Sequence, residues 1–261
     1  MSTIRVAGRI GRGIGLGILL GAAGVAGLLA LEIAIARARR YARPEIGPGI
    51  RATLGGSGGR TIRMVMLGDS MAAGVGVQTV GDSVGGQLAS LLAGPNQRVE
   101  LSSVAVSGSG SADLDTQVSR ALLGRRPDVA VILVGCNDAL RLVNPEHAAA
   151  DLASAVQRLT GAGVGVVVGT CPDLGAARAL ATPLRQIVGW LGRRIAAAQA
   201  PAVREAGGVP VDLAERTGAV FRADAGTLCE DGFHPSADGY RIWAHALYPA
   251  VYEAVRTVRS H

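Results

Sequence analysis

Lysine is absent from this chain of 261 residues, so all 26 basic residues are arginine. The absence excludes mechanisms that need a lysine amine, such as a pyridoxal Schiff base or the lysine of a phosphate-binding loop. Only four histidines and three cysteines are present, the cysteines at positions 136, 171 and 229, with no H-E-x-x-H or C-x-x-C pattern. The sequence therefore predicts neither a metal site nor a cofactor.

Aromatic residues are also scarce, at 3% of the chain. The net charge of +6 lies entirely in residues 1–43, which carry seven arginines and one acid, whereas residues 44–261 carry nineteen of each sign. A neutral domain lacks the basic surface of a nucleic-acid binder, and few aromatics argue against base stacking. We expect no nucleic-acid partner.

The basic N-terminal segment brackets a long run without charge. Between Arg12 and Glu32, residues 13–31 are all uncharged. As a helix this run would span about 28 Å, close to the ~30 Å hydrocarbon core of a bilayer. We therefore predict that residues 1–43 form an N-terminal transmembrane anchor, crossing the cell membrane once with the following domain outside the cytoplasm. A cleaved secretory signal and a buried helix are the alternatives.

Residues 44–61 are rich in glycine and proline and favour a linker. From residue 62 to residue 258, short apolar strands alternate with amphipathic helices. Strands are expected at 62–67, 99–106, 129–134, 164–169 and 209–213, and helices at 83–92, 112–123, 146–161, 178–206 and 236–258. Repeated strand–helix units predict an α/β domain whose parallel sheet, of about five strands, carries helices on both faces. A site is then expected at the carboxyl ends of the strands.

Four polar segments follow these strands or precede the last helix. They are Gly68-Asp69-Ser70 with Gly74, Ser107-Gly108-Ser109-Gly110, Gly135-Cys136-Asn137-Asp138, and Asp231-Gly232-Phe233-His234. Each segment alone is typical of an ordinary turn. Together, the four segments supply different parts of one reaction mechanism.

In this order the four segments resemble the blocks of the SGNH, or GDSL, hydrolase family. Ser70, Gly108, Asn137 and His234 stand at the four letters, and the resemblance covers about residues 62–258. Two positions depart from the family pattern, since Met71 replaces a leucine and Ser103 an asparagine. The resemblance implies a flavodoxin-like three-layer α/β/α fold and ester or acyl-transfer chemistry.

The residue types also indicate this chemistry directly. Ser70 is the predicted nucleophile, His234 its general base, and Asp231 the carboxylate that orients the imidazole ring. The backbone N–H groups of Ser70 and Gly108 and the side-chain amide of Asn137 are the predicted oxyanion donors. A second glycine, at position 110, leaves the backbone donor of this loop open.

Neighbouring residues receive structural roles. Asp69 is expected to orient the turn at Ser70, and Asp138 to accept structural hydrogen bonds. His147 begins one helix and His245 lies within another, so neither is expected in the site. A disulfide between Cys171 and Cys229 is conceivable in an extracytoplasmic domain; otherwise the three cysteines are thiols.

The sequence thus predicts a membrane-anchored serine esterase that hydrolyses carboxylic esters of a small molecule, a lipid or an O-acylated glycan. An O-acyltransferase with the same acyl-enzyme and a non-catalytic binding module are the alternatives. Two other motifs are excluded. Asp113 occupies the last glycine position of a dinucleotide fingerprint, and Ala72 occupies the last glycine position of G-x-S-x-G.

Overall fold

The computed structural model describes residues 27, 49–56 and 59–258, and their sheet has six strands. In space the strands follow the order β1-β3-β2-β4-β5-β6. Neighbours from β3 to β6 pair in parallel, and β1 pairs antiparallel with β3 at one edge. The strands are β1 Arg51–Leu54, β2 Arg60–Gly68, β3 Gln97–Ser103, β4 Val129–Leu133, β5 Gly165–Gly169 and β6 Val209–Val211.

The predicted α/β domain with a parallel sheet is confirmed, and the five expected strands are β2 to β6. The additional strand β1 lies inside the segment that composition favoured as a linker. Its side chains alternate between exposed and half-buried positions, and it has only four residues. Such an edge strand depends on pairing with β3 and leaves little apolar periodicity in the sequence.

Helices cover both faces of this sheet. They are α2 Val84–Leu92, α3 Leu114–Leu122, α4 Cys136–Leu140, α5 Pro145–Gly161, α6 Leu184–Glu205, α7 Leu213–Ala223 and α8 Ala237–Val258. Short 3-10 turns are η1 Val80–Asp82, η2 Ser111–Asp113, η3 Leu174–Ala176 and η4 Ala225–Thr227. Helices α4 and α7 were not predicted from the sequence, because α4 is a single turn and α7 starts only two residues after β6.

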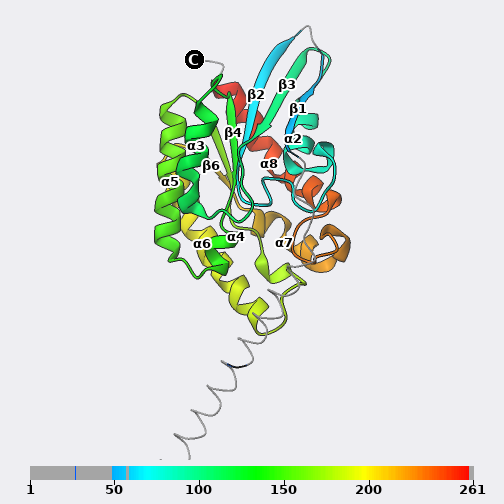
Figure 1. The fold of residues 1–261 in the computed structure, drawn as a ribbon, viewed down its shortest axis with the longest axis vertical. Helices are drawn as coiled ribbons and strands as arrows, with labels where there is room; N and C mark the ends of the chain where they lie inside the picture. The colour runs from blue at the N-terminus through cyan, green and yellow to red at the C-terminus, as the bar shows by residue number, and fades with distance from the viewer. Residues whose placement is uncertain (1–26, 28–48, 57–58, 259–261) are drawn as a thin grey trace, which may run out of the picture.

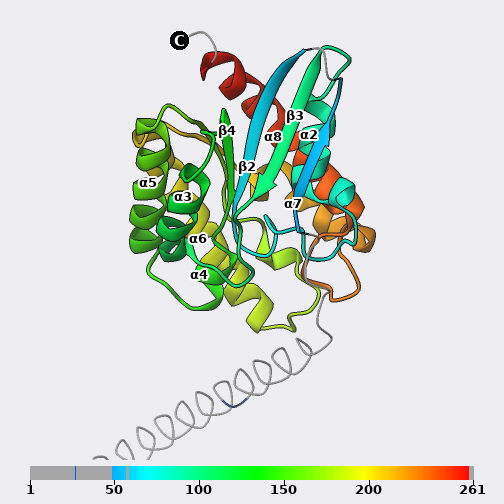
Figure 2. The ribbon, with the colours of Figure 1, turned by 45° about the horizontal axis from the view of Figure 1, so that its top comes forward.

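The three layers follow from alternation along the strands. In β2, Met64 and Met66 face one core, which α2, α7 and α8 cover, whereas Val65 and Leu67 face a second core under α3 and α5. Figures 1 and 2 show α3 and α5 on one side of the sheet and α2 and α8 on the other. This arrangement confirms the predicted α/β/α architecture.

Helix starts follow local capping. The Ser83 hydroxyl accepts a hydrogen bond from the Gly86 N–H at 3.1 Å and caps α2. The Ser236 hydroxyl accepts one from the Gly239 N–H at 3.3 Å and caps α8. Helix α6 begins later than expected, directly after Pro183, and continues through Pro201.

No helix in the described ranges is long and apolar enough to cross a membrane. The longest, α6 and α8, have 22 residues each, and both are amphipathic, with five charged residues in α6 and four in α8. Such helices pack one face on the sheet and expose the other to solvent. The prediction of a protein that crosses the cell membrane once is therefore wrong on this evidence. The predicted run 13–31 lies outside the described residues, apart from Gly27.

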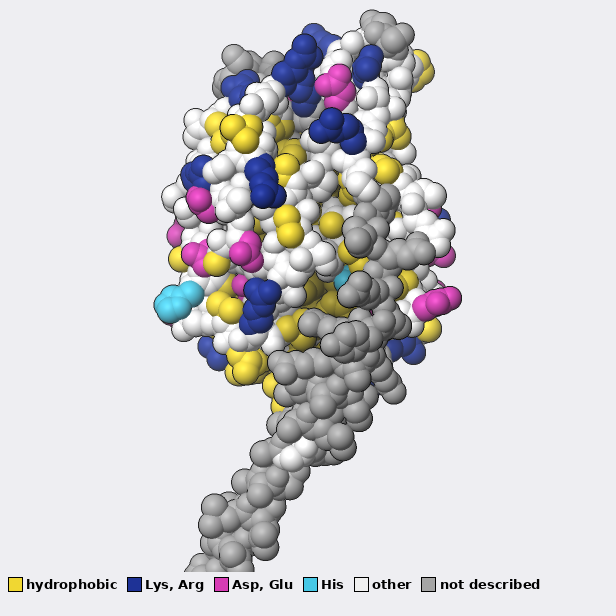
Figure 3. Space-filling view, viewed as in Figure 1, with side chains coloured by type: hydrophobic (Ala, Val, Ile, Leu, Met, Phe, Trp, Pro, Cys, Tyr) yellow, Lys and Arg dark blue, Asp and Glu magenta, His cyan; other side chains and the backbone are white. Residues whose placement is uncertain are grey.

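The charged surface does not mark the site. In Figure 3, several basic side chains gather over the amino ends of β2 and β3, around an acidic side chain. Arg63 and Arg98 both pair there with Glu100, at 3.6 and 3.9 Å. Elsewhere on this face, charged groups of both signs are scattered. The basic group lies at the opposite end of the sheet from the carboxyl ends of the strands, where the polar segments meet.

Candidate active site

Ser70 follows the carboxyl end of β2. The strand ends at Gly68, which has a φ of +129° and lies so close to β4 that a Cβ there would be 1.8 Å from the Leu133 carbonyl oxygen. Only glycine fits this approach. The Asp69 N–H then donates to Leu133 O at 3.0 Å, and the Asp69 carboxylate accepts from the Met71 N–H at 2.9 Å. Asp69 therefore orients the turn, as predicted, and this turn presents Ser70.

His234 and Asp231 come from the loop between η4 and α8. The Asp231 Oδ2 lies 2.5 Å from His234 Nδ1, and His234 Nε2 lies 3.0 Å from the Ser70 hydroxyl. Because an ionised carboxylate can only accept, Nδ1 carries the hydrogen and Nε2 is left to accept from Ser70. The structure thus joins these three predicted site residues in one hydrogen-bonded chain. Ser70 and His234 are 164 residues apart in the sequence, and the packing of α8 on the sheet brings them together.

The Asp231 carboxylate is held in its charged form. Burial by itself would raise its pKa, but the hydrogen bond and charge of His234 and two backbone donors outweigh that effect and hold the pKa well below its usual range. These donors are the N–H groups of Phe233 and His234, at 2.8 and 2.9 Å from Oδ1. A three-residue spacing lets one tight turn supply them, so the loop fixes Asp231 and His234 together.

The predicted oxyanion donors lie in the loop after β3 and in α4. The Asn137 amide donates to the Ser109 carbonyl oxygen at 2.9 Å, which uses one of its two hydrogens. The Gly110 N–H donates to Asp113 at 2.8 Å, so it is not available to a ligand. Gly108, which has a φ of +88°, is then the glycine of this loop whose N–H is left for a ligand. In residues 59–258 the N–H groups of Ser70 and Gly108 have no acceptor.

Asp138 of α4 and Arg141, the residue that follows α4, fix the same loop. Asp138 accepts from the Ser111 N–H, at 3.0 and 3.1 Å, and from the Ser111 hydroxyl at 2.9 Å. This is the structural role predicted for Asp138. The Arg141 guanidinium donates to the Gly108 carbonyl oxygen at 2.7 Å. One short helix and its C-cap residue therefore set the position of the loop that carries Gly108.

The sequence analysis missed Gln117, a buried residue of α3. Its side-chain carbonyl accepts from the Gly68 N–H at 2.7 Å, and its amide donates to Gly68 O at 2.9 Å and to the Ser109 hydroxyl at 3.1 Å. Gln117 thus ties the turn of Ser70 to the loop of Gly108. A glutamine on a helix gives no sign of burial, and only the neighbouring strand ends reveal its role.

Other titratable groups surround the site. Burial raises the pKa of Asp69 to about 7, and the nearby charge of Asp138 adds to this, against the hydrogen bond from Met71. His147 and His245 are both exposed, outside the site, as predicted. All three cysteines are free, so the conceivable bridge between Cys171 and Cys229 does not form. In the described part of the chain, no group of three or more metal-binding side chains is found.

Comparison with known proteins agrees with this arrangement. Residues 66–242, well over half of the chain, match the GDSL-like lipase/acylhydrolase family. The chain belongs to this family. Within it, the GDSL-like esterase Rv1075c of Mycobacterium tuberculosis is 39% identical over 197 residues, which are 74% of this chain and 63% of that esterase.

Solved structures of other proteins share the fold. A catalytic mutant of the acetylxylan esterase Axe2 from Geobacillus stearothermophilus has a TM-score of 0.55 at 19% identity, covering 76% of this chain and 95% of that one. A putative lipolytic G-D-S-L protein from Desulfitobacterium hafniense has a TM-score of 0.57 at 16% identity, covering 72% and 98%. At these identities the similarity establishes the GDSL fold.

Proposed function

We propose that this GDSL protein is a serine esterase that cleaves carboxylic esters through an acyl-enzyme. The observation that carries the proposal is the chain of contacts from Ser70 to His234 to Asp231. Ser70 is a poor nucleophile unless a base takes its proton, and His234 Nε2 lies within reach to do so. The ionised Asp231 stabilises the imidazolium that forms.

The reaction then runs in two halves. The Ser70 oxygen attacks the ester carbonyl carbon while its proton moves to His234 Nε2, and collapse of the tetrahedral intermediate expels the alcohol with that proton. Water next attacks the acyl-enzyme, again giving its proton to His234, and releases the carboxylic acid and Ser70. In both halves the developing oxyanion lies against the N–H groups of Ser70 and Gly108 and the second amide hydrogen of Asn137.

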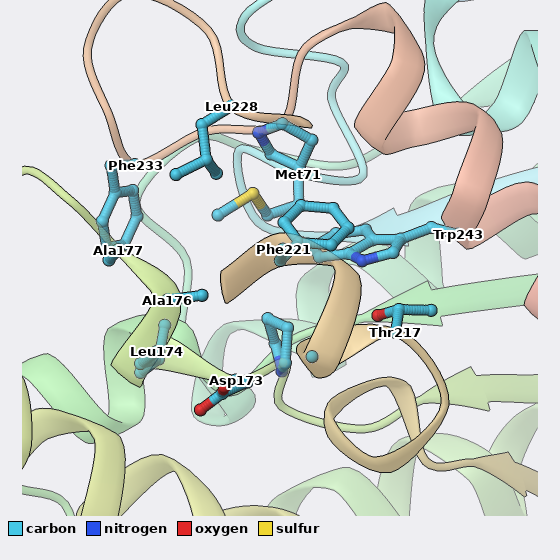
Figure 4. A pocket seen from close by; sticks show the side chains of 13 residues that line it. Met71, Asp173, Leu174, Ala176, Ala177, Thr217, Phe221, Leu228, Phe233 and Trp243 are labelled. Atoms are coloured by element: carbon cyan, nitrogen blue, oxygen red, sulfur yellow. The ribbon is translucent and has the colours of Figure 1, made fainter. Parts of the chain in front are cut away.

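The acyl part of the substrate is assigned to an apolar hollow beside the contact chain. It has a volume of about 360 Å³ including its open mouth. Met71 and Phe233, the chain neighbours of Ser70 and His234, line it together with Leu228, Phe221 and Trp243. Figure 4 shows the Met71 side chain reaching between Leu228 and Phe221. Met71 therefore bounds this small hollow beside Ser70, which favours short acyl groups.

The alcohol part of the ester, to which the acyl group is attached, is assigned by analogy. Two of the proteins compared above are named esterases, and one of them is an acetylxylan esterase. Together with the small hollow, these names favour a short-chain ester such as an O-acylated glycan over a long-chain lipid.

Ester hydrolysis by the full chain tests the proposal. Turnover of p-nitrophenyl esters should be highest for short acyl groups and unchanged by chelators. A serine-directed organophosphate should label Ser70. Ser70→Ala and His234→Ala should each remove nearly all turnover, and the double variant should be little worse, because the two residues act as one unit.

His147→Ala and His245→Ala are the matched controls and should stay within a few-fold of the unmodified protein. Folded Ser70→Ala protein with full activity would refute the proposal. A glycerol acceptor in the assay separates hydrolysis from acyl transfer, since transfer would yield acylglycerol instead of free acid.

A further inference from the structure

Cys229 lies in the loop that carries Asp231 and His234, and its backbone closes that loop. The Cys229 N–H donates to the His234 carbonyl oxygen at 2.9 Å, and its own carbonyl accepts from the Gly232 N–H at 2.9 Å. Leu228, which precedes Cys229, and Pro235, which follows His234, form an isolated β-bridge. Cys229 is therefore held at a defined place beside the carboxylate.

The thiol of Cys229 points at Asp231. Its Sγ lies 3.1 Å from Asp231 Oδ1, the oxygen that also accepts from the Phe233 and His234 N–H groups. Oδ2 is left for the His234 ring. Asp231 thus has three donors on one oxygen and the imidazole on the other, and the thiol is the only side chain among the three.

This thiol stays protonated at neutral pH. Burial raises the pKa of Cys229 to about 11, and the negative charge of Asp231 contributes to the increase. A protonated thiol can donate a hydrogen bond, whereas a thiolate beside a carboxylate would repel it. Cys229 is for the same reason a poor nucleophile.

We infer that Cys229 is a positioning residue, whose S–H group donates to Asp231 and so sets both the place of the carboxylate and the strength of its contact with His234. The inference rests on the proposed function of Asp231 and His234. A donor on Oδ1 spreads the carboxylate charge, which weakens the attraction between Asp231 and the imidazolium. Loss of this donor should therefore shift the pH dependence of the reaction upward.

The other titratable groups near Asp231 and His234 are unchanged in every variant of Cys229. Asp69 approaches from the turn after β2, and Tyr240 from α8, where its hydroxyl donates to Val75 O at 2.6 Å. Cys136 from α4 also lies in this electrostatic neighbourhood. The side chain of Glu230, in the same loop, is exposed. A shift confined to Cys229 variants is then assigned to the thiol.

The test compares Cys229→Ala with Cys229→Ser in the full chain. The pH dependence of kcat/KM is measured from pH 4.5 to 9. Without the donor, Cys229→Ala should move the acid limb of this pH profile to higher pH by about 0.3–0.6 units. It should also lower kcat about 3- to 10-fold, with KM little changed. Cys229→Ser restores a donor and should return the limb to within ~0.2 units of the unmodified protein.

Ser236→Ala is the matched control, because it removes a hydroxyl contact to Gly226 O in the same region without touching Asp231. It should lower stability and leave the acid limb in place. If Cys229→Ala does not fold, Cys229→Val carries the same test, since valine also lacks a donor. An unmoved limb in the alanine or valine variant, or equal shifts with serine and alanine, would overturn the inference.

Failure of the inference and failure of the proposed function are separable. Asp231→Asn and His234→Ala should be nearly inactive if the proposed function holds. If they are inactive while Cys229→Ala has the pH profile of the unmodified protein, only the role of Cys229 is lost. If they keep full activity, the proposed function itself fails.

Discussion

Asn137 shows how much depends on a single side chain in this site. Its amide donates one hydrogen to Ser109 O, so its orientation is set by the loop that also carries Gly108. Under the proposed function, the second amide hydrogen meets the substrate oxygen. A donor whose direction is already fixed needs no reorganisation when negative charge develops, so it would stabilise the transition state more than the bound ester.

Replacing Asn137 with alanine should accordingly lower kcat about 100- to 1000-fold, or roughly 2.7–4 kcal/mol, with a much smaller change in KM. Steady-state kinetics with a p-nitrophenyl ester measures both. Asn144→Ala is the matched control, since Asn144 accepts from the Glu146 N–H and caps α5 away from the site. It should cost about 1 kcal/mol of stability and little kcat. Normal kcat in folded Asn137→Ala protein would remove Asn137 from the oxyanion donors.

At the scale of elements, α3 and α4 bring together loops that are far apart in sequence. Gln117 from α3 bonds both backbone groups of Gly68 and the Ser109 hydroxyl. The same loop is contacted by Asn137 and Asp138 of α4 and by Arg141, the residue after it. Buried polar groups cost free energy unless they are paired. These contacts therefore stabilise the fold and fix the site at once.

Gln117→Leu should leave the buried Gly68 N–H without a partner, whereas the Gly68 carbonyl oxygen keeps its hydrogen bond from the Val106 N–H at 3.1 Å. We expect a loss of about 1–3 kcal/mol in the free energy of unfolding, the cost of one buried unpaired group. At a temperature where the variant is folded, kcat should fall about ten-fold, because the turn of Ser70 and the loop of Gly108 both lose their hydrogen bonds to residue 117. Urea unfolding and steady-state kinetics measure the two effects.

The control for this variant is Gln157→Leu, because Gln157 is an exposed glutamine on α5. It should change the free energy of unfolding and kcat little. Equal behaviour of the two leucine variants would show that Gln117 has no special role.

The packing of Met71 between α7, α8 and the His234 loop sets the room in the hollow. Met71→Ala should raise the kcat/KM ratio of longer to shorter acyl esters several-fold, because it empties space beside Ser70. Stability should fall by about 2–5 kcal/mol, as for a buried methionine. Met66→Ala is the control, since Met66 is fully buried in the same core but does not line the hollow. An unchanged ratio in Met71→Ala would place the acyl group elsewhere.

On the scale of the whole molecule, buried Asp69 links stability to pH. Its pKa rises from 3.8 to about 7 on folding, so between these values the folded protein keeps a proton that the unfolded chain releases. Stability from this group is complete below pH 3.8 and is lost as pH rises towards 7. The depressed pKa of Asp231 acts in the opposite direction, but only below its unfolded value of 3.8.

Asp69→Asn should therefore gain stability relative to the unmodified protein as pH rises from 4 to 7, by up to about 1.4 kcal/mol per pH unit. Urea unfolding at a series of pH values measures the difference. Asp238→Asn, at an exposed position of α8, should run parallel to the unmodified protein. Parallel curves for Asp69→Asn would mean that Asp69 is already ionised in the folded state.

The sequence by itself determined five of the six strands, most of the helices, the parallel pairing and the identity of the candidate site residues. Apolar runs such as 129–134 mark strands buried on both faces, and Ser70, Gly108, Asn137 and His234 stand in short local motifs. Such features are visible because each depends on neighbours in the chain. The sequence also led to a wrong prediction, a single membrane pass, which no described helix supports.

Only the tertiary structure decided which groups meet. It placed His234 Nε2 3.0 Å from Ser70, and it paired the Gly110 N–H with Asp113, which leaves Gly108 as the candidate backbone donor. It buried Gln117 between two loops and set the Cys229 thiol against Asp231. These contacts join residues whose spacing in sequence carries no signal, or whose hydrogen-bond partners compete, and only packing selects among them.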